Sequence, residues 1–300
     1  MTGYLHPDYA ASLKDFGMPR QLLRSGGWVL VRKIPKSPYR DAMGCYPLFA
    51  CEEWSQIGAD LEQMGNDLVS LALVADPFGA YDIATLQRSF DKVIPFKEHY
   101  IVDLNSPVTI TTSNHHRYYA RRALRNVSVQ KEPNPSGLLD VWAALYAELT
   151  EKRKITGLRT FSKESFAKQL SVPGITAFRA VQEDEIIGIH LWYVHGEVAY
   201  SHLEAVNATG YKLGAAYALY WSALEFFADQ LRWADLGAGA GTTNDRKDGL
   251  SRFKKGWSTG TRTAYFCGRI CNLERYEEVV GAKGVAPTDY FPAYRKGEFI

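Results

Sequence analysis

The residues with the clearest potential for chemistry lie between Arg232 and Trp257, in the sequence RWADLGAGAGTTNDRKDGLSRFKKGW. An expected strand ends at Asp235, a glycine-rich loop follows it, and Phe253 and Lys254 come next. A lysine ammonium on a flexible stem can reach into a cleft, where it suits a phosphate or a developing oxyanion. A solvated pair of basic residues would show the same local sequence.

The stretch DLGAGAG, taken alone, resembles the glycine-rich nucleotide loop of a methyltransferase. In that class of enzyme a helix follows the loop at once, inside a doubly wound sheet. Here the residues TTNDRKDG follow, which are typical of a turn, and too little chain remains to complete such a sheet. The sequence therefore argues against a nucleotide loop and favours a loop that leads to Lys254.

A second candidate site lies in NATGYKLGAAYALYW, over residues 207–221. Polar residues and glycines precede an apolar helix, so free backbone N–H groups are expected at its start, near Gly214. Such groups attract anions, and Lys212 adds positive charge beside Tyr211. Ordinary helix capping by Thr209 explains the same pattern.

A third candidate is the basic helix expected over residues 114–125. Arg117, Arg121 and Arg125 recur at intervals of four residues, with Arg122 beside them, so they share one helix face. Such a stripe suits the phosphates of RNA or of a nucleotide-linked substrate. A solvated helix face is the alternative interpretation.

Two histidines complete the candidates. His190 and His202 lie on neighbouring expected strands, with Tyr200 close to the second. Either imidazole could assist removal of a proton from an amine. A histidine that is simply hydrogen-bonded within the sheet fits the sequence as well.

The order of the expected elements predicts an α+β fold. Strands are expected at 28–32, 68–75, 99–104, 175–181, 186–194, 197–205 and 232–236, and helices at 52–65, 83–90, 114–125, 138–152, 162–170 and 215–228. In the second half, a helix pair, an antiparallel meander, a central helix and a strand follow one another, which is typical of the GNAT fold of N-acyltransferases. The segment Lys131–Gly137, with two prolines and no apolar residue, is the expected linker.

Composition limits the classes of protein that fit. The chain has 300 residues, of which 46% are hydrophobic, and a net charge of +2, so a packed core is expected and the overall charge does not indicate nucleic acid. No signal peptide and no apolar run of membrane-spanning length is present, which predicts a cytoplasmic protein without a membrane span. The spacing of Cys267 and Cys271 does not fit a zinc site, and no metal is expected.

Taken together, four stretches resemble the Fem-type aminoacyltransferases and related GNAT-superfamily proteins. They are HYIVDL followed by HHRYYARRAL, AELTEKR, AVNATGYKLGAAYALYWSALEFF, and WADLGAGAG through GLSRFKKGW. The resemblance implies two tandem GNAT-like domains, each a mixed, mostly antiparallel sheet flanked by helices. We expect them at residues 1–130 and 138–300, with a C-terminal tail that could pack back on the first domain. It also implies transfer of an amino acid from aminoacyl-tRNA to an amine.

The resemblance also implies roles for single residues. Lys254 would stabilise the tetrahedral oxyanion, Phe253 would pack beneath it, and Asp103 would act as a base or positioning group. His202 completes the expected catalytic set. The residues expected to bind substrate or donor are Phe253, Tyr200, Tyr211, Lys212, Gly214, Arg117, Arg121, Arg122 and Asp235.

Several points stay open at the level of sequence. The chain lacks the long coiled-coil arm of some family members, and its tail is not part of the pattern. The donor could be aminoacyl-tRNA or acyl-CoA, with no tightly bound cofactor, and the acceptor an amine of a peptide, sugar or small metabolite. An acetyl-CoA-dependent GNAT enzyme and a non-catalytic GNAT-fold binding module, whose cleft bulky side chains would block near Lys254, are the alternatives. The oligomeric state is open.

Overall fold

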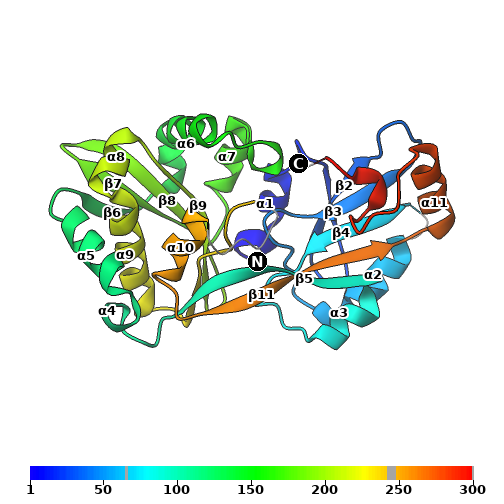
Figure 1. Cartoon of the computed structure of the whole chain (residues 1–300), viewed down its shortest axis with the longest axis horizontal. Coiled ribbons are helices and arrows are strands. Elements are labelled where there is room, and N and C mark those ends of the chain that lie inside the picture. The colour runs from blue at the N-terminus through cyan, green and yellow to red at the C-terminus, as the bar shows by residue number, and fades with distance from the viewer. Residues whose placement is uncertain (65–66, 242–247, 299–300) are drawn as a thin grey trace. The chain divides into compact units, whose positions relative to one another are not determined.

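The computed structural model of the chain describes residues 1–64, 67–241 and 248–298. The chain forms two compact units, which are described one at a time (Figure 1). Unit 1 consists of residues 1–3 and 97–263, and unit 2 of residues 4–96 and 264–300. The strands β5 (Lys92–Asp103) and β11 (Gly260–Ile270) contribute residues to both units.

Unit 1 is built on a mostly antiparallel sheet with the strand order β5-β10-β9-β8-β7-β6. Its strands besides β5 are β6 (Ser128–Glu132), β7 (Ile175–Gln182), β8 (Glu185–His195), β9 (Val198–Val206) and β10 (Trp233–Asp235). The pairing between β9 and β10 is parallel, and the other neighbouring strands of this order pair antiparallel. Glu183 and Asp184 both have positive φ, as the tight turn between β7 and β8 requires.

Helices cover both faces of this sheet (Figure 1). On one face α6 (Leu139–Arg153) and α7 (Lys163–Gln169) pack Trp142 and Phe166 onto the meander. Ser162 caps α7 by accepting a hydrogen bond from the backbone of Ser165, as its sequence predicts. The other helices of the unit are α4 (Val108–Thr111), α5 (Asn114–Ala123), α8 (Ala208–Leu213), α9 (Ala215–Ala228) and α10 (Gly249–Lys255).

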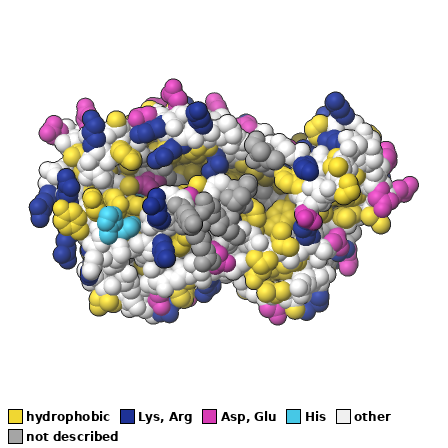
Figure 2. All heavy atoms as spheres, viewed as in Figure 1, with side chains coloured by type: hydrophobic (Ala, Val, Ile, Leu, Met, Phe, Trp, Pro, Cys, Tyr) yellow, Lys and Arg dark blue, Asp and Glu magenta, His cyan; other side chains and the backbone are white. Residues whose placement is uncertain are grey.

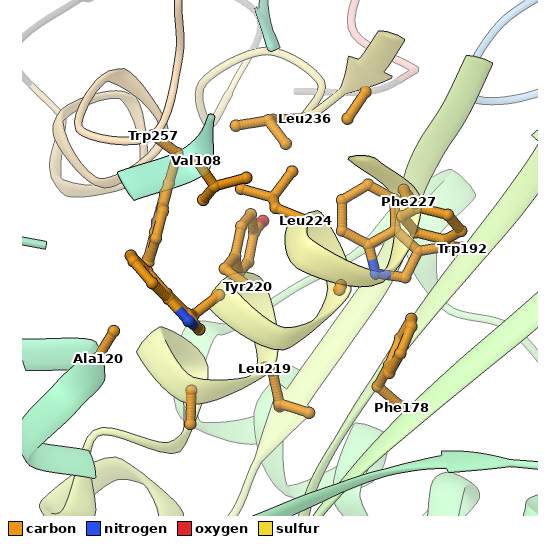
Figure 3. Packing of buried hydrophobic residues seen from close by; sticks show 14 of the residues in the cluster. Val108, Ala120, Phe178, Trp192, Leu219, Tyr220, Leu224, Phe227, Leu236 and Trp257 are labelled. Carbon is orange, nitrogen blue, oxygen red and sulfur yellow. The ribbon is translucent and has the colours of Figure 1, made fainter. Parts of the chain in front are cut away.

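Helix α9 is the central helix of the opposite face. Its sequence is apolar nearly all round, and it is buried as expected. Figure 3 shows Tyr220, Leu224 and Phe227 of this helix lying between Trp192 of β8 and Trp257, which follows α10. The rings of Tyr220 and Trp257 stack with centroids 5.8 Å apart. This aromatic core fixes the end of α10, and therefore the helix that carries Lys254.

The strands of unit 2 follow the order β1-β2-β3-β4-β11 and pair in a mixed arrangement. Its strands are β1 (Met18–Gln21), β2 (Trp28–Lys33), β3 (Arg40–Gly44) and β4 (Ser70–Val74), followed by residues of β11. Only the pairing of β3 with β4 is parallel among these described strands. The helices are α1 (Pro7–Ser12), α2 (Ile57–Met64), α3 (Ile83–Ser89) and α11 (Leu273–Ala282). Phe49, Trp54 and Leu73 lie in its main core.

The division into units differs from the boundaries expected at 130 and 138. The segment KEPNPSG connects β6 to α6 inside unit 1, because β6 pairs with β7 along its whole length. Residues 264–300 belong with residues 4–96 instead of with the second half of the chain. Proline and glycine mark a change of direction in either case, so composition alone does not distinguish an interdomain linker from a connection within a domain.

Most of the expected elements are present, with their limits shifted by a few residues. The strands β1, β3, β6 and β11 and the helix α11 were not expected from the sequence. The turn expected at TTNDRKDG falls mostly on residues 242–247, outside the described part of the chain. No helix within residues 1–64, 67–241 and 248–298 has the length and apolar character to cross a membrane.

Candidate active site

The candidate site begins where the pairing between strands β9 and β10 ends. Trp233–Asp235 pairs in parallel with Val198–Tyr200, and the pairing between the two strands ends there. Among the described strands, residues 201–206 pair with β8 alone. Strand β10 therefore ends at Asp235, whereas β9 continues to Val206 with no β10 neighbour beyond Tyr200.

Helix α10 places Lys254 near this point. Asp248 caps the helix, with its Oδ1 accepting hydrogen bonds from the backbone of Leu250 at 2.8 Å and Ser251 at 3.0 Å. The Lys254 Nζ donates a 2.8 Å hydrogen bond to the carbonyl of Ala238, just beyond β10. Gly237 has a φ of +73°, and a Cβ at this position would lie 3.1 Å from Nζ, so a glycine lets the ammonium approach the loop closely.

The ammonium of Lys254 is unusually acidic. Burial lowers its pKa to about 8, and the charges of Asp235, Glu204 and Asp248 oppose that shift. At neutral pH the group is therefore still mostly protonated. A half-buried ammonium can stabilise a developing oxyanion more strongly than one in water, because the surrounding dielectric is lower.

The carboxyl group of Glu204 lies on β9 in the same electrostatic environment. Burial raises its pKa to about 7, while the charge of Lys254 acts in the opposite direction. Its Oε1 is buried and has no hydrogen-bond partner among the described residues. Sequence reasoning did not identify this residue, since a lone glutamate on a strand carries no motif.

His190 is the histidine that lies near this group. It is the cross-strand partner of Glu204, and its Nε2 lies 2.8 Å from the Ser201 hydroxyl. Burial and then the charge of Lys254 hold the pKa of His190 well below its usual value. The ring is therefore neutral, which matches the hydrogen-bonded strand histidine that the sequence allowed.

His202, expected to be catalytic, lies elsewhere. It sits at a bulge of β9, and its Nε2 is 3.2 Å from Oε1 of Gln169 at the end of α7. Its ring packs on Tyr193, and burial lowers its pKa to about 3. The bulge turns His202 toward the α7 side of the sheet, away from the face that carries His190, so the structure does not bring it together with Lys254.

Phe253 lies in the aromatic core next to Lys254. Its ring contacts Tyr217 and Tyr220 of α9, with centroids 5.0 Å away in both cases. Its carbonyl oxygen lies 2.8 Å from Nε2 of His116, a buried histidine of α5. Gly256 permits this contact, because a Cβ there would lie 2.0 Å from the His116 ring. His116 thus ties α5 to α10, a role that its sequence gave no signal for.

Asp235 and Asp103 have different surroundings. Asp235 is buried and accepts hydrogen bonds from His99 Nδ1 at 2.8 Å and from the backbone of Gly237 at 2.7 Å. Asp103 forms a partly exposed ion pair with Arg232 at 3.0 Å. Asp235 therefore shapes the loop under Lys254, whereas no described contact links Asp103 to Lys254.

Tyr200 and Gly214 are two further residues that the sequence analysis expects to bind substrate or donor. Tyr200 is buried and is the strand partner of Asp235. Gly214 has a φ of +73° and joins α8 to α9. Its N–H donates to carbonyl groups of Gly210 and Tyr211 in the cap of α8, so this N–H is not one of the free groups expected to attract an anion near Gly214.

The remaining expected binding residues lie on the surface of unit 1. Arg117 is engaged by the Thr109 carbonyl and the Asn114 side chain, whereas Arg121 and Arg122 are exposed. Figure 2 shows Lys and Arg side chains gathered at the left edge of the view, which is where α5 lies in Figure 1. Tyr211 and Lys212 of α8 are also exposed, and Lys152 lies 4.8 Å over the Tyr211 ring.

No group of three or more His, Cys, Asp or Glu side chains within the described ranges is arranged to hold a metal ion. The ammonium of Lys254, just beyond the end of β10, is of a kind that suits an anionic or polarised group.

Residues 113–255 match a family model described as Acetyltransferase (GNAT) domain. Several solved structures share the fold of almost the whole chain. One is FemX, at 13% identity and a TM-score of 0.64, covering 91% of this chain and 93% of that one. Another is L-PGS from Bacillus licheniformis, at 14% identity and a TM-score of 0.60, covering 96% and 99%.

A third similar structure is the C-terminal domain of a putative lysylphosphatidylglycerol synthetase from Agrobacterium fabrum. It has 13% identity and a TM-score of 0.62, and 91% of each chain is covered. A comparison with curated protein sequences gives no match. The likeness to FemX confirms the fold that the sequence resemblance implies. The family-model match over residues 113–255 and the shared fold thus support an acyltransferase of the GNAT fold.

Proposed function

We propose that the protein moves an aminoacyl group from aminoacyl-tRNA onto an amine of a peptide, sugar or small metabolite. The observation that carries this proposal is the half-buried ammonium of Lys254, hydrogen-bonded to Ala238 where the pairing of β9 with β10 ends. The chemistry that such a group performs best is stabilisation of an oxyanion.

The reaction needs few groups from the protein. The amine attacks the carbonyl carbon of the donor ester, and the negative charge that develops on the carbonyl oxygen is stabilised by Lys254. Collapse of the tetrahedral intermediate releases the ribose oxygen of the donor. An aminoacyl ester is already activated, so no covalent intermediate with the enzyme is required.

Two observations support the aminoacyl donor. The exposed guanidinium groups of Arg121 and Arg122 on α5 suit the phosphates of RNA. Among the similar structures, one is named FemX and one is named for lysylphosphatidylglycerol synthesis. The description of the matching family model favours the second candidate function, which is acetyl transfer from acetyl-CoA.

The experiment that tests the proposal compares the two donors directly. The protein is incubated in parallel with charged tRNA and with acetyl-CoA, and label transfer to a panel of amines is followed. We expect transfer from charged tRNA. Transfer from acetyl-CoA alone would support the second candidate. A folded protein that transfers from neither would be the binding module.

Salt dependence gives an independent measure of the donor. In the double variant Arg121→Ala, Arg122→Ala, the slope of log affinity for tRNA against log salt should fall in magnitude by about 2, because each phosphate contact contributes about 1. The exposed Arg88 of α3, in unit 2, provides the control variant Arg88→Ala, which should keep the full slope. An unchanged slope in the double variant would exclude these arginines from the donor site.

A further inference from the structure

A buried carboxyl oxygen without a partner requires an explanation, because such groups are rare in folded proteins. Glu204 Oε1 is of this kind among the described residues, and it lies on β9 four residues beyond the last pairing with β10. A structural carboxylate would be satisfied by backbone or side-chain donors, as Asp235 is by His99 and Gly237. Glu204 therefore has capacity to accept a hydrogen bond from a bound molecule.

The ionisable groups around Glu204 come from several elements. His190 of β8 is its cross-strand partner and is neutral. Tyr220 of α9 interacts with it electrostatically, and burial keeps that phenol protonated by raising its pKa. Lys254 of α10 supplies the positive charge. Helix α8 also contacts β9, and its Tyr211 and Lys212 are exposed.

No hydrogen bond among the described residues fixes the charge state of Glu204 Oε1. Of the groups around it, Lys254 is the one that stabilises the carboxylate by its charge. A carboxyl group whose pKa lies near neutrality is suited to take up and release a proton at that pH. Burial provides this property here, with a pKa of about 7.

We propose that the carboxylate of Glu204 accepts the proton of the acceptor amine and returns it to the leaving oxygen of the donor. This inference rests on the proposed acyl transfer and assigns its missing base. It differs from the sequence expectation, which named His202 and Asp103 for such a role. The ammonium of Lys254 and the carboxylate of Glu204 would then serve the carbonyl oxygen and the amine of one tetrahedral intermediate.

The proton balance of this step is complete. As the amine nitrogen forms the C–N bond, the carbonyl electron pair moves to the oxygen beside Lys254, and the surplus N–H proton passes to Glu204. The C=O bond then reforms, the bond from carbon to the donor oxygen breaks, and the carboxylic acid returns the proton to that oxygen. The products are an amide and an alcohol, and both side chains regain their starting states.

The sign of the pH dependence follows from the two groups. Glu204 must be deprotonated to act as a base, so the rate should rise with pH through about 7. Lys254 must be protonated to stabilise the oxyanion, so the rate should fall above about 8. A narrow bell-shaped profile is expected for the single-turnover rate.

The test uses the full-length protein and the donor that supports transfer in the parallel assay. Single-turnover rates are measured from pH 5.5 to 9.5 for the wild type, Glu204→Gln and Glu225→Gln. Glu225 of α9 is the matched control, since partial burial also raises its pKa. We expect Glu204→Gln to lose about 100-fold or more in rate together with the acidic limb of the profile, and Glu225→Gln to keep both.

Three outcomes would overturn the inference. One is a wild-type rate that does not change between pH 5.5 and 7.5, a result that does not depend on whether any variant folds. Another is a folded Glu204→Gln protein that retains its rate within about threefold and keeps the acidic limb. In both cases acyl transfer itself stands. Failure of the wild type to transfer from either donor would remove the proposed function and this inference together.

Discussion

The two units contain buried charged clusters that are built in opposite ways. In unit 2, Arg295 donates through Nε and Nη2 to both oxygens of Asp41 at 2.8 Å, and also to the Lys33 carbonyl and to Glu298. Every nitrogen of that guanidinium has a partner. In unit 1, Lys254 donates a hydrogen bond to the Ala238 carbonyl, and Glu204 Oε1 has no hydrogen-bond partner within the described chain.

This difference separates a structural cluster from the cluster that we propose to be reactive. The Arg295 cluster joins the C-terminal segment to β2 and β3 through saturated, two-pronged hydrogen bonds, which hold their charges fixed. The Lys254 cluster leaves a base and an acid with pKa values of about 7 and 8, so each can change its state near neutral pH. Incomplete pairing is unfavourable for stability, and its presence in the GNAT domain indicates a role in binding or chemistry.

The largest effect on folding should come from the saturated cluster. Arg295→Ala leaves Asp41, which is 1% exposed, without its main counter-charge. The free energy of unfolding should fall by about 3–5 kcal/mol, as measured by urea titration at pH 7. The exposed ion pair of Arg20 and Asp67 in the same unit is the control, and Arg20→Ala should change stability by less than about 1 kcal/mol. Equal effects of the two variants would contradict the structural role of Arg295.

The reactive cluster should behave in the opposite way. Lys254→Ala removes the group that we propose to stabilise the oxyanion, and kcat should fall about 100- to 1000-fold, equal to about 2.7–4 kcal/mol of barrier. Its unfolding free energy should change by only about 1 kcal/mol, the usual net value of one hydrogen bond. The exposed neighbour Lys255 gives the control variant Lys255→Ala. Full turnover of Lys254→Ala would show that the assignment of the site is wrong.

The stability of unit 1 should also depend on the charge of Glu204. Its pKa in the folded protein, about 7, is raised above the value of 4.5 for the free side chain. This group therefore favours the folded state below about pH 4.5, and that advantage is lost as pH rises through 7. Relative to Glu204→Gln, the wild type should lose up to about 3 kcal/mol of unfolding free energy between pH 5 and 8. Parallel stability curves for the two proteins would mean that Glu204 is not buried in its charged form.

Much of the fold was predictable from local patterns. The alternation in β7, β8 and β9 and the apolar surface of α9 predicted these elements within a residue or two. Short or polar edge strands such as β1 and β6 were missed, since few of their residues face a core. The unit boundaries were misplaced because residues 264–300 join a unit whose other part lies far away in the sequence.

The candidate site was predicted in part. Lys254, Phe253 and Asp235 were identified because a glycine-rich loop and a lysine stood together in one segment. Glu204 and His116 were missed, since each acquires its role from an interaction with a distant part of the sequence, the charge of Lys254 for Glu204 and a hydrogen bond to the Phe253 carbonyl for His116. A local sequence pattern cannot predict an interaction between residues so far apart in the chain.

The sequence by itself determined which side chains were available and which segments become helices or strands, because periodicity and turn residues act over short distances. It also placed Lys254 after a glycine-rich loop, and the backbone of this loop can approach the lysine ammonium closely because glycine has no Cβ. Tertiary structure alone decided that Glu204 rather than His202 lies near that ammonium, through the bulge of β9 and the end of its pairing with β10. Burial set the protonation states of both groups, because the loss of solvent depends on every element that packs around them.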